Sequence, residues 1–516
     1  MSRLKKTTTE GDHLEQREKM ANTRKPPQIS RRALLRDGCT VLAGTSILPF
    51  LIRGQDEKAG TADITPVTLK LSTYMSEAKD RELPGEVVEK TKQHILDTIA
   101  AMVSGSELPP GHQALKYALA CGGKKIATVV ASKIVIGPIE AALINGMLAH
   151  SDETDDSHAP SQSHPGCAVV PAALAAGEQF HVSGNRFLRC VALGYDVGTR
   201  VTMTLGAGPY ESSSHRSTHS IATTFGAAAA AACAADLSAQ QMRWVLNYAA
   251  EQSSGIALWN RDPDHIEKAF DFAGGPARNG VTAAMVVNSG WTGVDDVFAG
   301  SNNFFLAFNP SSNPEGLIDK LGAEYEVTRT DIKRWTVGSP IQAPLDALLD
   351  IRNERSFSPD QVMEIGVRLA PQEAPIVDNA ALPDICLQHL IAVMLIDGTV
   401  TFRSSHDKGR MQDSLVLRER AKVKLIPDEA LGKLMPRRQA IVEVTLRDGS
   451  TYKKQVDSVR GTVANPMTSD EVKAKARGLM LPTLGAPSTS HLIDGIFALE
   501  HVSDIRELRK FLQKAG

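Results

Sequence analysis

The chain has 516 residues, more than one simple hydrophobic core normally supports, so two domains are expected. Lys and Arg total 57 against 59 Asp and Glu, giving a formal net charge of −2 that would not draw nucleic acid or an anionic membrane surface. This balance favours a small-molecule or protein partner. Apolar residues make up 42% and aromatic residues only 5%, as in a core built from Ala, Leu, Val and Ile.

The first sixty residues resemble a targeting segment rather than part of a fold. Residues 1–29 are polar and are predicted to be disordered. Arg31 and Arg32 then precede an apolar run from Cys39 to Ile52, which is a twin-arginine-type export pattern. The run is shorter than the roughly 20 apolar residues of a membrane span. We expect a periplasmic or exported protein that meets the twin-arginine translocation machinery. Cleavage of the signal and its retention as an anchor both remain open, and an ordinary basic helix start is the alternative.

Residues 66–330 show the pattern of a helical domain. "GEVVEKTKQHILDTIAAMVSG" spaces its apolar residues near the helical period and closes on Gly105. Pro138 suits the first turn of a second helix, and Ser238 with Gln241 forms a capping-box pattern. "FGAAAAAACAADL" predicts a helix with side chains so small that its neighbours could pack very close.

The pattern changes in residues 331–470, where an α+β lid domain is predicted. "VMEIGVRL", "AKVKLIP" and "IVEVTLRDGSTYKKQV" alternate apolar and polar residues, and Asp448-Gly449 marks a hairpin. Helices are expected between them in "PLDALLDIR" and "ICLQHLIAVMLIDG". Residues 471–516 turn helical again and are expected to return to the first domain. The fold class is therefore mainly α, with a large all-helical domain and a smaller α+β lid domain.

The six cysteines do not indicate a metal or disulfide framework. They lie far apart without a C-x-x-C pair, and each is expected to be a small buried apolar residue.

Chemistry concentrates in "GMLAHSDETDDSHAPSQSHPG", residues 146–166, which combines histidines and carboxylates after an apolar helix. A carboxylate beside an imidazole can shuttle protons near neutral pH. The same side chains can bind zinc, iron or manganese, although no H-E-x-x-H-type pairing is present. The third interpretation is a solvated acidic loop that caps the helix. The residues of this segment alone leave these three possibilities open.

Basic patches elsewhere favour a small polycarboxylate as the ligand. Arg216 and His219 precede the alanine helix, whose N-terminus suits an anion. Lys268 lies in "HIEKAF" and Lys333 in "DIKRW". Together with a proton-shuttling loop, such cations would hold the carboxylates and stabilise negative charge in the reaction.

These motifs resemble those of the MmgE/PrpD family in the same order. The resemblance is carried by "GMLAHSDETDDSH", "SHPG", "THSIATTFGAAAAAA" and "EKAFDFAGGPARNGVTAAMVVNSGWTGVDDVFAG", and it extends from about residue 68 to "LIDGIFALE" in the tail. The family includes 2-methylcitrate dehydratases, cis-aconitate decarboxylases and related isomerases. The resemblance implies a helical domain with an α+β lid, a homodimer, and activity without a metal or organic cofactor.

The resemblance also implies which residues form the site. Glu153 and Ser157 stand where the family usually has Asp and Thr, and Ser217 stands where it usually has a histidine, so that role would pass to His219. Gln342 replaces a lid histidine, and His389 replaces a tyrosine. These departures suggest a changed substrate. The expected catalytic residues are Glu153, Ser157, His164 and Lys268, and the expected substrate-binding residues are Arg216, His219, Lys333, Gln342 and His389.

The expected reaction is proton transfer next to a carboxylate. A dehydratase or decarboxylase of a di- or tricarboxylic acid fits this site, as does an isomerase or epimerase of a related acid. A non-catalytic organic-acid-binding protein and a metal-dependent hydrolase are the alternatives from other classes.

Overall fold

The computed structural model describes residues 64–514. The twin-arginine pattern and the polar segment before it lie outside the described residues, so the export prediction is not tested. Within 64–514, no helix combines the length and the apolar character that crossing a membrane requires.

The first part of the described chain is helical, with one short antiparallel pair, β1 (Ala127–Thr128) and β2 (Val135–Ile136). Its helices are α1 (Pro66–Glu77), α2 (Gly85–Gly105), α3 (Pro109–Ala118), α4 (Pro138–Ala149), α5 (Gly166–Phe180), α6 (Gly184–Leu205), α7 (Ala207–Ser214), α8 (Thr218–Ala234), α9 (Ala239–Gln252), α10 (Ile266–Ala269), α11 (Gly275–Asn288) and α12 (Phe304–Phe308).

The sequence signals at several helix ends are confirmed. Pro138 opens α4 in its first turn, and Gly105 is the last residue of α2. The Ser238 and Gln241 side chains form the expected reciprocal capping box at the start of α9.

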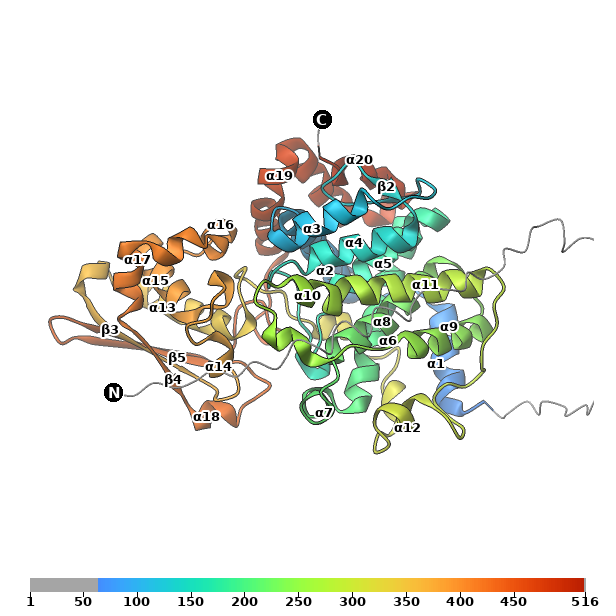
Figure 1. Cartoon of the computed structure of the whole chain (residues 1–516), viewed down its shortest axis with the longest axis horizontal. Coiled ribbons are helices and arrows are strands. Elements are labelled where there is room, and N and C mark those ends of the chain that lie inside the picture. The colour runs from blue at the N-terminus through green and yellow to red at the C-terminus, as the bar shows by residue number, and fades with distance from the viewer. Residues whose placement is uncertain (1–63, 515–516) are drawn as a thin grey trace, which may run out of the picture. The chain divides into compact units, whose positions relative to one another are not determined.

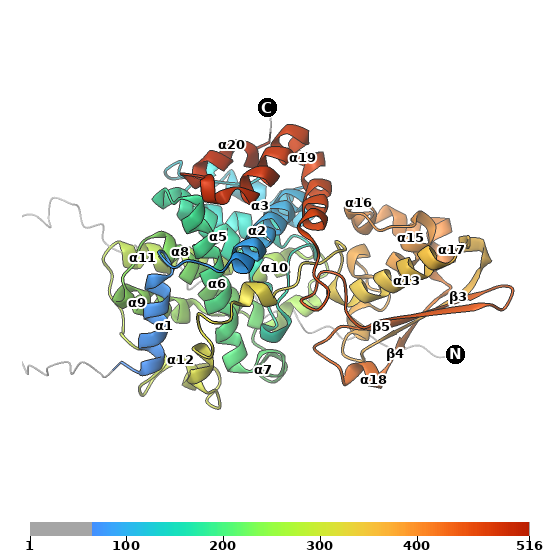
Figure 2. The same ribbon diagram turned by 180° about the vertical axis from the view of Figure 1, so that it is seen from behind.

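Helix α8 is the centre of the helical domain, and every one of its residues is buried. Figures 1 and 2 show it enclosed by α5, α6 and α11. A Cβ on Gly194 of α6 would lie 2.8 Å from the Gly226 carbonyl oxygen, and one on Gly280 of α11 would lie 2.4 Å from the Ala228 nitrogen. The expected close packing around the alanine helix is therefore confirmed, because these backbones approach too closely for larger side chains.

The smaller α+β domain contains a four-stranded sheet in the order β4-β3-β5-β6. Its strands are β3 (Val362–Leu369), β4 (Val423–Pro427), β5 (Ala440–Leu446) and β6 (Thr451–Val456). The β3–β4 pair is parallel, and the other pairs are antiparallel. Asp448-Gly449 turns β5 into β6 as expected, with Gly449 at φ +86°.

The helices of this domain are α13 (Gln342–Glu354), α14 (Ala374–Val377), α15 (Leu387–Asp397), α16 (Phe402–His406), α17 (Ser414–Arg420) and α18 (Glu429–Gly432). Helices α13 and α15 pack on each other and on the sheet, as Figure 1 shows. The predicted fold class, mainly α with a smaller α+β domain, is confirmed.

The last helices, α19 (Ser469–Phe497) and α20 (Arg509–Leu512), pack on the helical domain. Lys92 of α2 donates to the Phe497 carbonyl oxygen at 2.9 Å, and Lys475 of α19 lies 2.6 Å from the Asp97 carboxylate. The buried apolar residues form two clusters, one in 335–459 and the other spanning both flanking parts of the chain. The domain boundaries predicted at residues 330 and 470 stay predictions.

Candidate active site

The histidine- and acid-rich segment is a buried loop rather than a solvated one. Helix α4 ends at Ala149, His150 caps it, and the chain turns through residues 151–157 before α5 begins at Gly166. Glu153 is 5% exposed, while Asp155 and Asp156 are fully buried. Buried carboxylates need charged or hydrogen-bonding partners, and each of these three has them. The interpretation as a solvent-exposed acidic cap is therefore wrong.

Asp155 holds two imidazoles with one carboxylate oxygen. The Nδ1 atom of His150 lies 3.0 Å from Asp155 Oδ2, and the Nδ1 atom of His164 lies 3.3 Å from the same oxygen. Burial opposes the charge on Asp155, but these two histidines hold the pKa of its carboxyl well below the ordinary value. A carboxylate behind an imidazole fixes the ring's orientation and tautomer, which is the arrangement of a general base.

His164 is neutral at physiological pH. Burial lowers its pKa to about 4, and the attraction of Asp155 only partly offsets that effect. Its Nδ1 faces Asp155, so the other ring nitrogen remains to take a proton. A neutral, oriented imidazole can accept a proton from a bound substrate.

Glu153 is held between two lysines. It forms an ion pair with Lys268, and Lys333 Nζ lies 3.4 Å from its Oε2. Lys333 also donates to the Glu153 carbonyl oxygen at 2.9 Å. Burial would raise the pKa of the Glu153 carboxyl, but the two ammonium groups hold it well below its usual range. Glu153 is thus ionised and positions two cations.

Asp156 anchors the loop to the helices behind it. It accepts hydrogen bonds from the Tyr195 hydroxyl and, at 3.0 Å, from the Gly166 main-chain N–H, and His94 Nδ1 lies 2.8 Å away. A Cβ on Gly166 would lie 2.6 Å from the Tyr195 hydroxyl oxygen and 2.7 Å from Asp156 Oδ2. The glycine after His164-Pro165 is therefore required by this close packing.

An aromatic wall supports the histidines. Phe272 lies in a single π-helical turn, Phe270–Gly274, of a kind often found at functional sites. Its ring stacks on His219 with centroids 3.8 Å apart and on His150 at 4.6 Å. Lys268 Nζ lies 5.0 Å from the centre of the same ring. Burial holds the pKa of His219 well below its usual value, so this ring is also uncharged.

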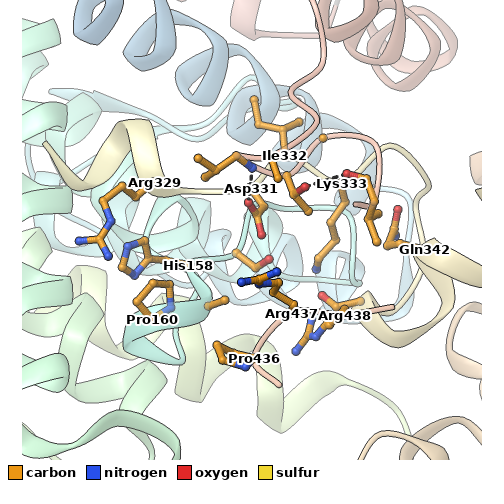
Figure 3. A pocket seen from close by; sticks show the side chains of 18 of the residues that line it. His158, Pro160, Arg329, Asp331, Ile332, Lys333, Gln342, Pro436, Arg437 and Arg438 are labelled. Atoms are coloured by element: carbon orange, nitrogen blue, oxygen red, sulfur yellow. Dashed lines mark hydrogen bonds between the residues drawn. The ribbon is translucent and has the colours of Figure 1, made fainter. Parts of the chain in front are cut away.

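A cavity of about 420 Å³ opens beside this cluster, within the size range of small-molecule sites. Figure 3 shows Lys333, Asp331, Arg437 and Arg438 around this space. Ser157, His164 and His219 also line it, and Pro160, Ile332 and Pro436 add apolar surface. The helical domain and the α+β domain both contribute residues to it.

The structure brings seven of the nine predicted residues together. The cavity is lined by Ser157, His164, His219, Lys333 and Gln342. Glu153 and Lys268 lie behind Lys333, paired with each other and outside the cavity lining. The Ser157 main chain pairs with that of Asp331, so the loop and the segment carrying Lys333 are fixed together.

Gln342 lines the cavity, but its side-chain amide is hydrogen-bonded to main-chain groups. Its amide nitrogen donates to the carbonyl oxygens of Trp335 at 2.8 Å and Val337 at 2.9 Å, and its amide oxygen accepts from the Trp335 N–H at 3.0 Å. The expected substrate contact is not supported, because both amide donors and the oxygen already have partners. Gln342 instead fixes the turn after Lys333.

His389 and Arg216 are not in the site. His389 is fully buried in α15, outside the cavity lining, and burial lowers its pKa to about 4. Arg216 lies outside the lining as well, with its guanidinium 4.4 Å from the centre of the Phe308 ring. Neither placement supports direct contact with a substrate in the cavity.

Two residues, one at the cavity and one that contacts the site loop, carried no usable signal in the sequence. Asp331 lies two positions before Lys333 and lines the cavity. His406 of α16 reaches across from the α+β domain, with Nε2 3.0 Å from Asp152 Oδ2. Such long-range pairs have no local periodicity or spacing that would reveal them.

Two triads among the described residues have ligand atoms close enough to hold a metal ion: His150, Asp155 and His164, and His150, Glu153 and His265. Lys268 and Lys333 already neutralise Glu153, and Lys333 Nζ lies 3.9 Å from Asp155 Oδ1. A metal cation here would meet two ammonium groups, so these triads fit an acid/base cluster better than a metal centre.

Comparison with known protein families matches two successive parts of the chain. The MmgE/PrpD N-terminal domain matches residues 69–316, and the MmgE/PrpD C-terminal domain matches residues 335–494. The chain belongs to the MmgE/PrpD family.

Three curated relatives are similar over nearly the whole of their lengths. The cis-aconitate decarboxylase-like protein oryM of Aspergillus oryzae is 26% identical, with 86% of this chain and 98% of the relative covered. The cis-aconitate decarboxylase of Homo sapiens is 25% identical, with 87% and 94% covered. The cis-aconitate decarboxylase of Aspergillus terreus is 22% identical, with 86% and 96% covered.

Proposed function

We propose that this protein is a lyase that acts on a small di- or tricarboxylic acid by acid/base proton transfer, without a metal or organic cofactor. The observation that carries the proposal is His164, a neutral imidazole that lines the cavity with Asp155 behind it. Three similar proteins named as cis-aconitate decarboxylases or their like add support for a carboxylic-acid lyase.

The substrate's carboxylates would be bound by the cations at the cavity. Lys333 lines it, and Arg437 and Arg438 enter from the α+β domain. Arg437 is exposed and makes no side-chain hydrogen bond or ion pair within residues 64–514, so it is available to an anion. Carboxylates held by charged donors gain both affinity and orientation.

His164 would act at the carbon next to a bound carboxylate. In a dehydration it removes the proton from that carbon. In a decarboxylation the electron pair of the broken C–C bond is left on carbon, which must then receive a proton. Both routes develop negative charge beside Lys333, whose ammonium group stabilises it in a partly dry site. Glu153 keeps Lys333 and Lys268 in place, and Ser157 supplies a hydroxyl at the cavity wall.

A proton NMR screen in D2O tests the proposal. Citrate, methylcitrate, cis-aconitate and aspartate-derived acids would be incubated with the full chain. Loss of water or CO2 from any of them supports a lyase. Deuterium exchange or inversion without loss would indicate an isomerase or epimerase instead. Ligand binding without change in any acid would indicate a binding protein and contradict the proposal.

Two further proposals concern the setting of the enzyme. We infer export through the twin-arginine pattern at Arg31-Arg32 and assembly as a homodimer. Arg31→Lys with Arg32→Lys should retain the protein in the cytoplasm, and unchanged export would contradict that inference. Sedimentation should give twice the chain mass of 55.4 kDa before any signal cleavage, whereas a monomer would contradict the dimer.

A further inference from the structure

Asp331 lies at the junction between the site loop and the α+β domain. Its main chain forms two hydrogen bonds with Ser157, at 2.8 and 3.0 Å, and the next residue, Ile332, donates to the Gly461 carbonyl oxygen at 3.0 Å. The backbone is therefore tied on both sides, and the position of the side chain is fixed relative to Ser157.

One oxygen of the Asp331 carboxyl accepts a hydrogen bond within the described residues, and the other does not. Oδ1 accepts from the Val463 main-chain N–H at 3.0 Å. Oδ2 has no hydrogen-bond or ion-pair partner among residues 64–514, and the side chain lines the same cavity as His164 and Lys333. Figure 3 shows Asp331 beside Lys333 and Arg437 at this cavity.

The Asp331 carboxyl keeps its proton to a higher pH than an ordinary surface carboxyl does. Burial raises its pKa to about 6, although the Val463 N–H and the charges of Arg438 and His94 oppose the rise and Asp156 adds to it. Lys333 and Arg437 are the other cations of the lining close to it in Figure 3. The only other acid in the described lining is Asp457, which is exposed and accepts from Gln455 at 2.6 Å.

We propose that Asp331 is a catalytic residue, the proton donor that works with His164 on a substrate bound in the cavity. This inference rests on the proposed lyase function and adds to it the acid that neither the site loop nor the lysine pair supplies. Glu153 is held ionised by two ammonium groups, and Asp155 by its contacts with His150 and His164, so neither can donate a proton.

Each lyase reaction balances in protons and electrons, and His164 removes a proton from carbon only in the dehydration. In a dehydration, His164 takes the proton from carbon, and the C–H electron pair becomes the new C=C bond. The C–O bond breaks with its pair on oxygen, which receives the Asp331 proton and leaves as water. In a decarboxylation, the C–C bond breaks, CO2 leaves, and the electron pair left on carbon takes the Asp331 proton, so only Asp331 changes its protonation state. Proton exchange with water restores Asp331 after either reaction and His164 after the dehydration.

Kinetics of Asp331→Asn on the acid identified by the NMR screen test this role. The asparagine amide oxygen can still accept from Val463, so the fold should persist, and melting of Asp331→Asn and Asp331→Ala checks this. For the wild type, kcat/KM should fall as pH rises through about 6, because the donor loses its proton. Asp331→Asn should lower kcat about 100-fold or more and remove that fall. Asp80→Asn, at an exposed carboxylate on the helical domain, is the matched control and should change neither.

A binding measurement distinguishes an Asp331 carboxyl that gains and loses a proton from an Asp331 side chain with only a structural role. Ethane-1,2-disulfonate keeps its charge between pH 5 and 8, so any change in its affinity comes from the protein. The wild type should bind it several-fold more tightly at pH 5 than at pH 8, and Asp331→Asn should bind it equally at both. Normal turnover or an unchanged pH dependence in Asp331→Asn would overturn the role of Asp331 and leave the lyase intact. No turnover by the wild type would overturn both.

Discussion

The ammonium group of Lys333 donates to the Glu153 main-chain carbonyl oxygen at 2.9 Å and lies 3.4 Å from the Glu153 carboxylate. These residues are 180 positions apart, and their contact joins the site loop to the segment that leads into the α+β domain. Because Lys268 pairs with the same carboxylate, Glu153 also holds a second cation, which lies behind Lys333 and outside the cavity lining. The proposed chemistry depends on this placement of charge.

Lys333→Gln should therefore reduce both stability and catalysis. The buried Glu153 would lose one of two cationic partners and its carbonyl would lose a donor, which should cost about 2 kcal/mol of unfolding free energy. Loss of the cation beside developing negative charge should lower kcat/KM about 100-fold. Urea denaturation and steady-state kinetics measure the two effects. Lys320→Gln, in an exposed pair with Glu324, should leave both unchanged. Full activity in Lys333→Gln would remove Lys333 from the mechanism.

His164→Gln should abolish proton removal while the fold remains. The wild-type imidazole has its pKa lowered to about 4, so it accepts protons only above that pH. We expect kcat/KM of the wild type to rise with pH through about 4, and kcat of His164→Gln to be lower by at least about 100-fold. A pH–rate profile with matched melting curves measures this. A variant that retains wild-type kcat would show that another group is the base.

The contact between His406 and Asp152 should make stability depend on alkaline pH. Burial alone would lower the pKa of His406, but the hydrogen bond and charge of Asp152, with Asp384 at 3.9 Å, raise it to about 9. The stabilisation is complete below the unfolded pKa near 6.5 and is lost as pH rises through about 9. It amounts to about 3 kcal/mol at most.

Denaturation of the wild type and His406→Gln between pH 6 and 10 measures this contribution. The variant should be less stable at pH 6, and the difference should vanish by pH 10. His112→Gln, at an exposed histidine of α3, serves as the control and should show no such trend. An equal difference at both ends of the range would mean that the His406 charge is not the cause.

Metal removal should leave the activity intact. The two histidine-carboxylate triads lie beside Lys268 and Lys333, whose charges disfavour a bound cation. We expect dialysis against EDTA to leave kcat/KM unchanged and elemental analysis to find well under one equivalent of metal. Loss of activity on dialysis, with recovery on adding zinc or manganese, would overturn the acid/base account.

The sequence predicted most of the secondary structure because its signals were local. Pro138, the Ser238–Gln241 box and the Asp448-Gly449 turn act within a few residues, and each has the expected structure. The alternating strands near 362, 423 and 440 were equally clear. The alanine helix was recognisable because small side chains permit the close approach seen at Gly194 and Gly280.

The site was harder to predict because its contacts are long-range. The acidic loop resembled a solvated cap, since no local pattern reveals that Lys268 and Lys333 enclose Glu153. Gln342 lines the cavity, but the main-chain groups that bond to its side-chain amide are brought there by the fold and leave no signal in the sequence. His389 was predicted to bind the substrate only because of the family resemblance, and its burial in α15 does not support that role. Asp331 had no signal beyond lying near Lys333.

Proton NMR in D2O of the same panel of di- and tricarboxylic acids, incubated with the wild type and with His164→Gln, decides whether His164 is the catalytic base. We predict that the wild type releases water or CO2 from at least one acid, and that His164→Gln binds the same acid without this turnover. Equal turnover by both proteins, or none by the wild type with any acid, would contradict the claim that His164 in this cavity is the base of a carboxylic-acid lyase.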